Sequence, residues 1–392
     1  MKPVGIRQIG RHGALATVNH DEAAREDFIA SMYFAVQADV FPGNRLAYDR
    51  RVRPEFERGH GRAPEDRHEI RRAMAGEPLF QWWSGLRRTT QEMKQATGEE
   101  LVHRQIGKIN EEVARINRTG IGTLRLDPDL PLPGYASKVD FHGQPGGYYA
   151  ERCAEDTTPA AIYDPGVFVL TKGFMGPYCE AAGASAISFL RERFPDFEPK
   201  TILDIGCSVG HSTVPYSITY PESRIDAIDL SAPMLRYGYA RANSLGHPIH
   251  FSQQNAEATD FPSGSFDLVV SHIVLHETSR RALRNIFAES LRLLAPGGVM
   301  LHVEQRQNEG LEAFEQFYYD WDTLNNHEPF WGTLHDTDLA ELAADVGFAT
   351  TDIFQKMVPN VVSADLLRSQ IDDGQDFKRT STWLAFGAEK RS

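Results

Sequence analysis

The chain has 392 residues, 41% of them hydrophobic and 24% charged, and a formal net charge of −13 at pH 7. It is long enough for two domains, or for one domain with a large extension, and its composition is that of an ordinary globular protein. The sequence contains no apolar stretch long enough to span a bilayer and no apolar signal core in its first residues. Its cysteines include no pair with metal-ligand spacing. We therefore expect a cytoplasmic protein without a membrane span, a disulfide framework or a metal site.

The first part of the chain is predicted to be helical. Four segments rich in Arg, Glu and Ala are expected to form helices: residues 22–37, with Asp21 as N-cap, and residues 66–74, 86–97 and 99–117. The proline-rich run at residues 127–134 cannot continue a helix and is typical of a linker. We therefore place a helical N-terminal domain at residues 1–130 and a linker with a lead-in segment at residues 131–177.

From residue 178 onward, strand and helix patterns alternate. Seven segments are predicted as strands: residues 201–205, 224–229, 249–254, 266–271, 299–304, 350–354 and 382–389. Helices are expected before and between them: residues 179–194, 211–220, 232–244, 280–294 and 336–346. This alternation predicts an α/β fold with a doubly wound, mostly parallel seven-stranded sheet of the Rossmann-like type over residues 178–392. Such sheets bind ligands at the carboxyl ends of their strands, beside the point where the strand order reverses.

The most informative run is a buried strand, a glycine-rich turn and a helix start at residues 201–213. Gly206 and Gly210 let the backbone pass close to a ligand, which the amides of the helix N-terminus then face. The turn lacks both the G-x-G-x-x-G dinucleotide fingerprint and the G-x-x-x-x-G-K-[ST] phosphate loop. Asp204, just before the first glycine, would repel a pyrophosphate and attract an ammonium group. The pattern favours a cofactor with a cationic amino-acid end and no phosphate.

Polar residues also follow the next two predicted strands. Asp229 ends the second strand, where a carboxylate can accept both hydroxyls of a ribose, as in NAD enzymes. Asn255 follows the third strand and can meet an adenine amino group. Alternative interpretations stay open: Asp204 caps the turn, Asp229 is the N-cap of the helix that begins near Ala232, and Asn255 is a turn residue.

In their order and spacing these segments resemble the class I S-adenosylmethionine-dependent methyltransferases. The resemblance covers roughly residues 178–390 and rests on these segments: 203–210, 229, 255–256, 265–271 and 294–298. Two positions depart from the family pattern, because Ser208 replaces its middle glycine and Asn255 replaces a common aspartate. The resemblance implies S-adenosylmethionine as cofactor and implies cofactor contacts by the following residues: Asp204, Gly206, Cys207, Ser208, Gly210, Asp229, Leu230, Asn255, Ala256 and Ser271.

The methyl-accepting site of this family lies beyond the fourth and fifth strands, which directs attention to His272, His276 and Glu277 as candidate catalytic residues. The adjacent His276 and Glu277 are similar to the His-Asp pair of phenolic O-methyltransferases of plants, in which the histidine is the general base. The alternative for His276 is a structural or cofactor-contact role. His272 is expected to contact cofactor or substrate, or to cap the sheet. The two histidines lack a third candidate ligand, so no metal is expected.

The aromatic insertion at residues 305–335 is expected to cover the substrate. Its aromatic residues suit an aromatic or apolar acceptor, although residues 314–318 also fit a helical core stripe. The lead-in tyrosines Tyr148, Tyr149 and Tyr163 can fold over the cofactor or simply pack on the sheet. By analogy, the N-terminal domain is expected to serve as a substrate lid or as a homodimer interface.

The resemblance therefore predicts a methyltransferase for a small molecule, with O-methylation and His276 as general base. C-, N- or S-methylation by proximity alone is an alternative, including C-methylation of the quinone-pathway type. A protein or RNA methyltransferase and an inactive S-adenosylmethionine-binding scaffold are further alternatives. The acidic excess after residue 130 argues against a nucleic-acid partner.

Overall fold

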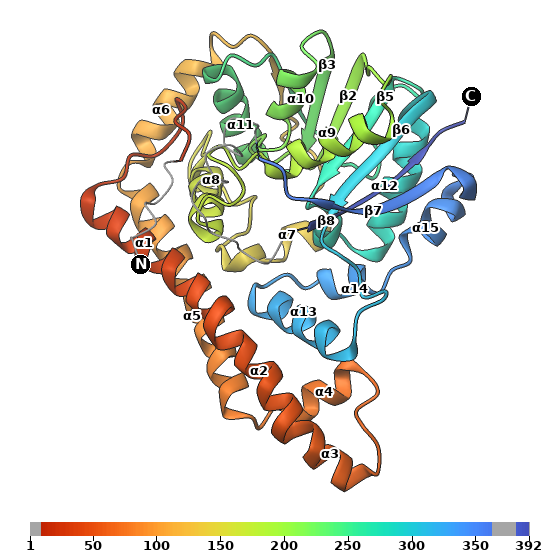
Figure 1. The fold of residues 1–392 in the computed structure, drawn as a ribbon. Helices are drawn as coiled ribbons and strands as arrows, with labels where there is room; N and C mark the ends of the chain where they lie inside the picture. Colours follow the sequence, from red (N-terminus) through yellow and green to blue (C-terminus); the bar gives the residue numbers. More distant parts are fainter. Residues whose placement is uncertain (1–8, 363–381, 392) are drawn as a thin grey trace.

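The computed structural model describes residues 9–362 and 382–391, and it shows a twisted sheet covered by helices, with long helices extending away from it (Figure 1). The expectation about a signal core concerns the first seven residues, which lie outside the described residues. In the described ranges, no helix combines the length and the apolar character needed to cross a bilayer.

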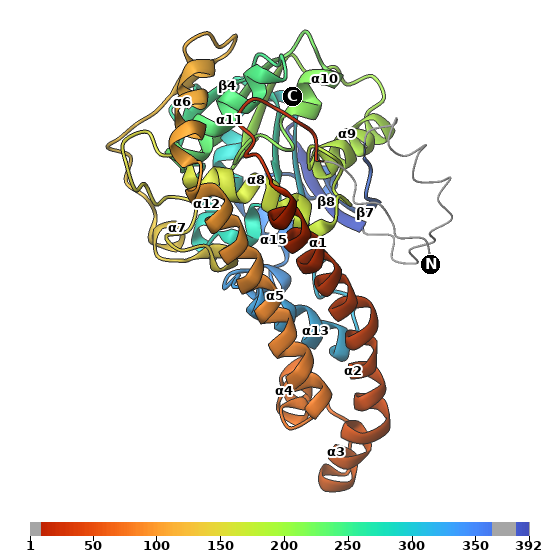
Figure 2. The same cartoon turned by 90° about the vertical axis from the view of Figure 1, so that its left-hand side faces the viewer.

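All but the last of the N-terminal helices form an arm that projects from the sheet, while the last one lies beside the sheet, as Figures 1 and 2 both show. The N-terminal helices are α1 (His20–Ala35), α2 (Phe41–Ala47), α3 (Arg53–His60), α4 (Arg67–Met74), α5 (Pro78–His103) and α6 (Ile106–Asn117), with π-helical turns η1 (Val36–Val40) and η2 (Tyr48–Val52). Asn19, and not Asp21, is the N-cap of α1, because its side chain accepts from the amides of Asp21 and Glu22. The helices predicted on either side of residue 98 include parts of the single long helix α5.

The sheet has eight strands in the order β1-β4-β3-β2-β5-β6-β8-β7. They are β1 (Thr123–Arg125), β2 (Thr201–Ile205), β3 (Arg224–Asp229), β4 (His250–Gln253), β5 (Phe266–His272), β6 (Leu294–Glu304), β7 (Ile353–Pro359) and β8 (Thr382–Glu389). All neighbours are parallel except β6–β8 and β7–β8, which are antiparallel. The α/β prediction is confirmed, but the predicted number of seven strands is wrong. The additional strand β1 pairs with β4 and is too short to show a periodic pattern.

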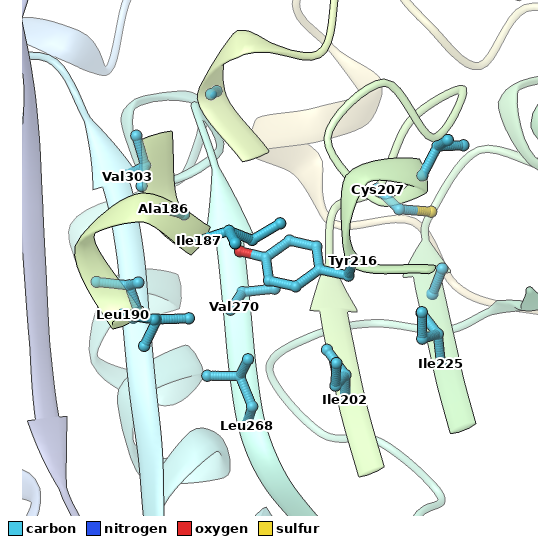
Figure 3. Packing of buried hydrophobic residues seen from close by; sticks show 14 of the residues in the cluster. Ala186, Ile187, Leu190, Ile202, Cys207, Tyr216, Ile225, Leu268, Val270 and Val303 are labelled. Atoms are coloured by element: carbon cyan, nitrogen blue, oxygen red, sulfur yellow. The ribbon is translucent and has the colours of Figure 1, made fainter. Parts of the chain in front are cut away.

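Helices cover both faces of the sheet. They are α9 (Ala181–Arg193), α10 (Val214–Thr219), α11 (Ala232–Ser244), α12 (Arg280–Leu293) and α15 (Leu339–Val346). On one face α9 and α10 pack over the central strands, and Figure 3 shows these contacts among Ala186, Ile187, Leu190, Tyr216, Ile202, Leu268, Val270 and Val303. On the other face α12 and α15 pack over alternate strand residues such as Leu203 and Val269. Burial on both faces explains why Ile202, Leu203 and Ile205 of β2 are apolar.

Between the arm and the sheet lies the lead-in segment, which contains α7 (Gly134–Ser137), η3 (Phe141–Gly143) and α8 (Thr158–Thr171). The sequence did not predict α8, because Pro165 and Gly166 interrupt its pattern. Most residues before Pro165 are buried, so tertiary packing outweighs the low helix propensity of Pro165 and Gly166.

The insertion after β6 packs on the arm. It contains α13 (Ala313–Asn325) and α14 (Trp331–His335), while η4 (Leu275–Glu277) follows β5 and η5 (Thr350–Asp352) precedes β7. Phe314 and Phe317 of α13 share a buried cluster with Phe80 and Trp83 of α5. The interpretation of Phe314 and Phe317 as a helical core stripe is therefore confirmed.

Candidate functional site

A pocket lies at the carboxyl ends of β2, β3 and β5, where the strand order reverses from β3 to β5 around β2. Its sheet side is lined by side chains and turns that follow these strands: Asp204–Ser208, His211, Ser212, Ile228–Leu230, Gln254–Ala256, His272–Val274, Glu277 and Thr278. Its opposite side is lined by aromatic side chains of the lead-in segment: Tyr135, Phe141, Tyr148, Tyr149 and Tyr163. A planar or apolar ligand group would therefore be enclosed between the sheet edge and these rings.

The glycine-rich turn after β2 adopts a conformation that few side chains tolerate. Gly206, Ser208 and Gly210 have positive φ values of 66°, 50° and 77°. A Cβ atom on Gly206 would lie 2.8 Å from the methyl carbons of Val274, so glycine is required there for packing as well. Ser208, which replaces the family's middle glycine, accepts the left-handed conformation, and its amide donates to Asp229 Oδ2 at 2.9 Å.

Asp204 is buried in the floor of the pocket. Its Oδ2 accepts from the hydroxyl of Thr213 at 2.5 Å, and its Oδ1 lies 3.3 Å from Nδ1 of His272. The other ring nitrogen of His272 lies 3.0 Å from the hydroxyl of Tyr216. These contacts hold a carboxylate at the edge of the glycine-rich turn, where it can meet an ammonium group.

Asp229 is held by the backbone at the end of β3. Its two oxygens accept from the amides of Ser208 and Ser231, at 2.9 and 2.8 Å. Burial raises the pKa of Asp229 to about 6, although these two amides favour the ionised form. Ser231, and not Asp229, is the N-cap of α11, so the capping interpretation of Asp229 is wrong. The remaining lone pairs of the carboxylate are available to ligand hydroxyls.

Asn255 and Ala256 lie beyond the end of β4 and line the pocket. The side-chain oxygen of Asn255 accepts from the amide of Glu257 at 2.9 Å, which is the geometry of an Asx turn. Asn255 is therefore a turn residue and a pocket residue at the same time.

The donors and acceptors of this pocket fit S-adenosylmethionine. Asp204 supplies a negative charge for an ammonium group, Asp229 supplies acceptors for ribose hydroxyls, and the turn from Gly206 to Ser208 leaves room that a Cβ atom would fill. Leu230 and Ile286 add apolar side chains to the lining of the same pocket, as an adenine ring requires.

Most residues that the resemblance implied as cofactor contacts line this pocket: Asp204, Gly206, Cys207, Ser208, Asp229, Leu230, Asn255 and Ala256. Gly210 and Ser271 are not among its lining residues. Gly210 faces the ring of Phe251, and the Ser271 hydroxyl pairs with Nδ1 of His302 at 2.7 Å. Burial lowers the pKa of His302 to about 3, so its ring stays neutral beside Ser271.

The candidate catalytic residues fall into two environments. His272 and Glu277 line the pocket, whereas His276 lies behind it and is 1% exposed. The ring of His276 packs against Trp331, with centroids 4.4 Å apart and the ring planes tilted by 32°, and its Nδ1 lies 3.0 Å from Glu304 Oε2. Burial alone would lower the pKa of His276, but the carboxylates of Glu304 and Glu328 raise it to about 9. The neighbouring acids, Glu304 above all, therefore favour the protonated form of His276.

Glu277 faces the pocket from η4. Its Oε1 accepts from the hydroxyl of Tyr148 at 3.0 Å and lies 3.7 Å from Nε2 of His142. Burial raises the pKa of Glu277 to about 7, while the nearby cation His276 opposes this rise. A carboxylate with this pKa can exchange a proton with a ligand at neutral pH.

Sequence reasoning missed several residues of the site. His142 of η3 and Glu328 between α13 and α14 lie far from the motif in sequence, and no local pattern marks them, whereas His211 directly follows Gly210 of the glycine-rich turn. Gln254, next to Asn255, follows the same strand end and could have been found from that position. Tyr135 and Phe141 precede the tyrosines that the sequence did identify.

The strand order and the pocket agree with the resemblance of this part of the chain to the class I S-adenosylmethionine-dependent methyltransferases. Within it, residues 202–298 match the family model described as "Methyltransferase domain". The family resemblance is thereby confirmed for this part of the chain, and S-adenosylmethionine is the methyl donor of this class.

Curated relatives match the same part of the chain. The malonyl-[acyl-carrier protein] O-methyltransferase of Hahella chejuensis is 31% identical over 119 residues, which cover 30% of this chain and 40% of the relative. The ubiquinone/menaquinone biosynthesis C-methyltransferase UbiE of Pasteurella multocida is 32% identical over 108 residues, which cover 26% and 39%. The chain thus spans less than half the length of these relatives.

Among solved structures, the phosphoethanolamine N-methyltransferase 2 of Haemonchus contortus in complex with S-adenosyl-L-methionine aligns with a TM-score of 0.42. Its sequence identity is 18%, and the alignment covers 59% of this chain and 58% of that chain.

Proposed function

We propose that this protein transfers a methyl group from S-adenosylmethionine to a small molecule. The observation that carries the proposal is a single pocket in which Asp204, Asp229 and Asn255 fit the cofactor while Glu277 borders the same space. When bound, S-adenosylmethionine supplies an electrophilic methyl group, and the electron pair of the broken carbon–sulfur bond stays on sulfur. The three cysteines carry free thiols, which supports the cytoplasm as the proposed location.

We propose an oxygen atom as methyl acceptor, with Glu277 and not His276 as general base. His276 is directed at carboxylates and is already protonated at neutral pH, so its position does not support the role that the sequence predicted. Glu277 lines the pocket and holds a proton only below about pH 7. Its carboxylate takes the proton of an acceptor hydroxyl and later releases it to solvent.

The relatives do not decide the acceptor atom. Their names include an O-methyltransferase and a C-methyltransferase, and the aligned segments cover less than half of each relative. Transfer to carbon, nitrogen or sulfur by proximity alone is still an alternative, as are a protein or RNA substrate and an inactive scaffold. The acid in the pocket wall favours an acceptor that has a proton to lose.

Isothermal titration calorimetry with S-adenosylmethionine tests the proposal. We expect the full-length protein to bind it, and Asp229→Ala to weaken binding by about 1.5–3 kcal/mol, because charge-assisted hydrogen bonds are lost. Asp260→Ala is the matched control, since Asp260 is an exposed acid that pairs with Arg125 outside the pocket. Folded protein without measurable binding would contradict the proposed function, and unchanged affinity of Asp229→Ala would contradict the role of Asp229.

A further inference from the structure

Asp164 of α8 is a buried carboxylate that the proposed methyl transfer does not use. Its side chain is 4% exposed, and its Oδ2 lies 2.7 Å from Nε2 of His12 and 2.8 Å from the hydroxyl of Tyr237. Its Oδ1 lies 2.6 Å from Nε2 of His211. Burial disfavours the charged form, but the contacts with His12 and His211 hold the pKa of Asp164 well below its usual range. Asp164 is therefore ionised and accepts all three hydrogen bonds.

This carboxylate joins segments that are far apart in the sequence. His12 belongs to the segment before α1, and His211 directly follows the glycine-rich turn. Arg241 of α11 approaches the same carboxylate, with 3.9 Å between its Nε and Oδ1, and its Nη1 donates to the backbone oxygen of Gly210 at 3.3 Å. Asp164 thus links the start of the chain to the turn that borders the cofactor pocket.

His211 extends this arrangement into the pocket. It is one of the lining residues, its side chain is 10% exposed, and its ring is stacked on that of Tyr163, with centroids 5.7 Å apart. Because the Asp164 carboxylate only accepts, Nε2 of His211 carries a hydrogen atom and donates it. Asp164 therefore fixes the orientation of the ring and leaves Nδ1 as the ring nitrogen that can meet a ligand.

The pocket offers few groups that can bear a positive charge. Its lining contains three carboxylates and, among the residues that the structure describes, no lysine and no arginine. Of its two histidines, His272 already has partners at both ring nitrogens, which lie 3.3 Å from Asp204 Oδ1 and 3.0 Å from the hydroxyl of Tyr216. This leaves His211 as the side chain of the lining that suits an anionic ligand group.

The amino-acid end of S-adenosylmethionine carries an ammonium group and a carboxylate on the same carbon. Asp204 fits the ammonium group, whereas the carboxylate needs a donor in a pocket that is otherwise acidic. Burial lowers the pKa of His211, and its contact with Asp164 opposes this shift. A ligand carboxylate at Nδ1 would add a second anionic neighbour, which favours the protonated ring.

We propose that Nδ1 of His211 binds the carboxylate of the cofactor, and that Asp164 and His12 position the His211 ring. The inference rests on the proposed function and deepens it, because it names the group that recognises the amino-acid end of the cofactor. It also gives the segment before α1 a part in cofactor binding, since His12 holds one oxygen of Asp164 while His211 is bound to the other.

The test compares S-adenosylhomocysteine with S-adenosyl-3-thiopropylamine, which keeps the adenosine, the sulfur and the amino group but lacks the carboxylate. By calorimetry, we expect the full-length protein to bind S-adenosylhomocysteine about tenfold more tightly or better, as a charge-assisted hydrogen bond provides. His211→Phe keeps a ring beside Tyr163, so it should abolish this preference and leave the affinity for the amine unchanged. His68→Phe, at an exposed position on α4, is the matched control.

Two further variants test the positioning residues in the same experiment. Asp164→Asn removes the charge that supports the protonated ring and should reduce the preference for S-adenosylhomocysteine. His12→Ala should also reduce it, whereas His12→Gln, which keeps a donor for Asp164, should restore it. A merely structural role would change the affinities for both compounds by the same factor.

The possible results separate this inference from the proposed function. Folded wild-type protein that binds neither compound contradicts the proposed function, whereas equal binding of both overturns only the carboxylate assignment. A preference that survives His211→Phe, or an equal loss of affinity for both compounds, overturns the role of His211. If His211→Phe does not fold, Asp164→Asn decides, and an unchanged preference in that variant overturns the inference.

Discussion

At the scale of single residues, the neighbouring side chains of His276 and Glu277 differ in their surroundings and in the direction of their contacts. His276 and Glu277 are adjacent in sequence, yet the first is turned toward Glu304 and Glu328 and the second toward the pocket. The paired carboxylates raise the pKa of His276 to about 9, and burial raises that of Glu277 to about 7. Local sequence alone cannot distinguish them, because Glu304 and Glu328 come from distant parts of the chain.

We expect Glu277→Gln to reduce kcat by about 10²- to 10⁴-fold, because the amide cannot accept the proton of the acceptor. The affinity of the Glu277→Gln variant for S-adenosylmethionine should change little. For the wild-type protein, kcat should rise as the pH increases through about 7, since the base is competent only when deprotonated. The measurement is a pH–rate profile of S-adenosylhomocysteine release with an acceptor that the protein methylates. If kcat of Glu277→Gln still rises near pH 7, a residue other than Glu277 is the general base.

At the scale of elements, the turn η4 is held by the end of strand β6. Oε1 of Glu304 accepts from the amides of Val274 and Leu275, at 2.8 and 2.6 Å, and Oε2 faces His276. Glu304 is fully buried, so these contacts replace its hydration. A single strand-end carboxylate thus fixes the backbone that presents Glu277 to the pocket, which makes it a positioning residue.

Glu304→Gln should destabilise the protein by about 3–5 kcal/mol, because a buried cation at His276 loses its counter-charge. Ionised Glu304 also supports the charge on His276, so removing it should lower the pKa of that histidine. NMR titration of the His276 ring and thermal unfolding measure the two effects together. The exposed residue Glu309 of the same region provides the control Glu309→Gln. An unchanged titration of His276 would contradict the role assigned to Glu304.

The elements also show which features a sequence can predict. The turn after β2 and the end of β3 were predictable, because glycine spacing and an apolar run are local signals. Strand β1 was not, because its three residues form a strand only through pairing with β4. Gly98 suggested a break in α5, yet it lies in helical structure where a Cβ atom would approach Ile162 to 3.2 Å. The contacts of His142 with Gln91 of α5 and with Glu328 of the insertion join residues far apart in the sequence, which no local pattern shows.

At the scale of the whole molecule, the arm and the insertion share one hydrophobic core. Phe80 and Trp83 of α5 pack with Phe314 and Phe317 of α13, and Arg67 of α4 pairs with Asp320 of α13 at 2.5 Å. The arm is therefore tied to the insertion that carries Glu328. Its roles as a lid and as a homodimer interface are still predictions.

Phe317→Ala should cost about 3–5 kcal/mol, the usual penalty for removing a buried phenylalanine. Because the core is shared, hydrogen exchange should accelerate in α4 and α5 as well as in α13. Hydrogen exchange followed by mass spectrometry measures this directly, and Phe28→Ala, at an exposed position of α1, is the control. Faster exchange confined to α13 would contradict a shared core.

The shared core has a consequence for synthesis of the chain. The aromatic face of α5 leaves the ribosome long before α13, since more than two hundred residues separate Trp83 from Phe314. During that interval the face of Trp83 and Phe80 lacks the partners that cover it in the finished protein. Exposed apolar surface of this kind is what chaperones bind and what promotes aggregation. Production of soluble protein should therefore depend on chaperone supply during translation, and most strongly for chains that end before the insertion.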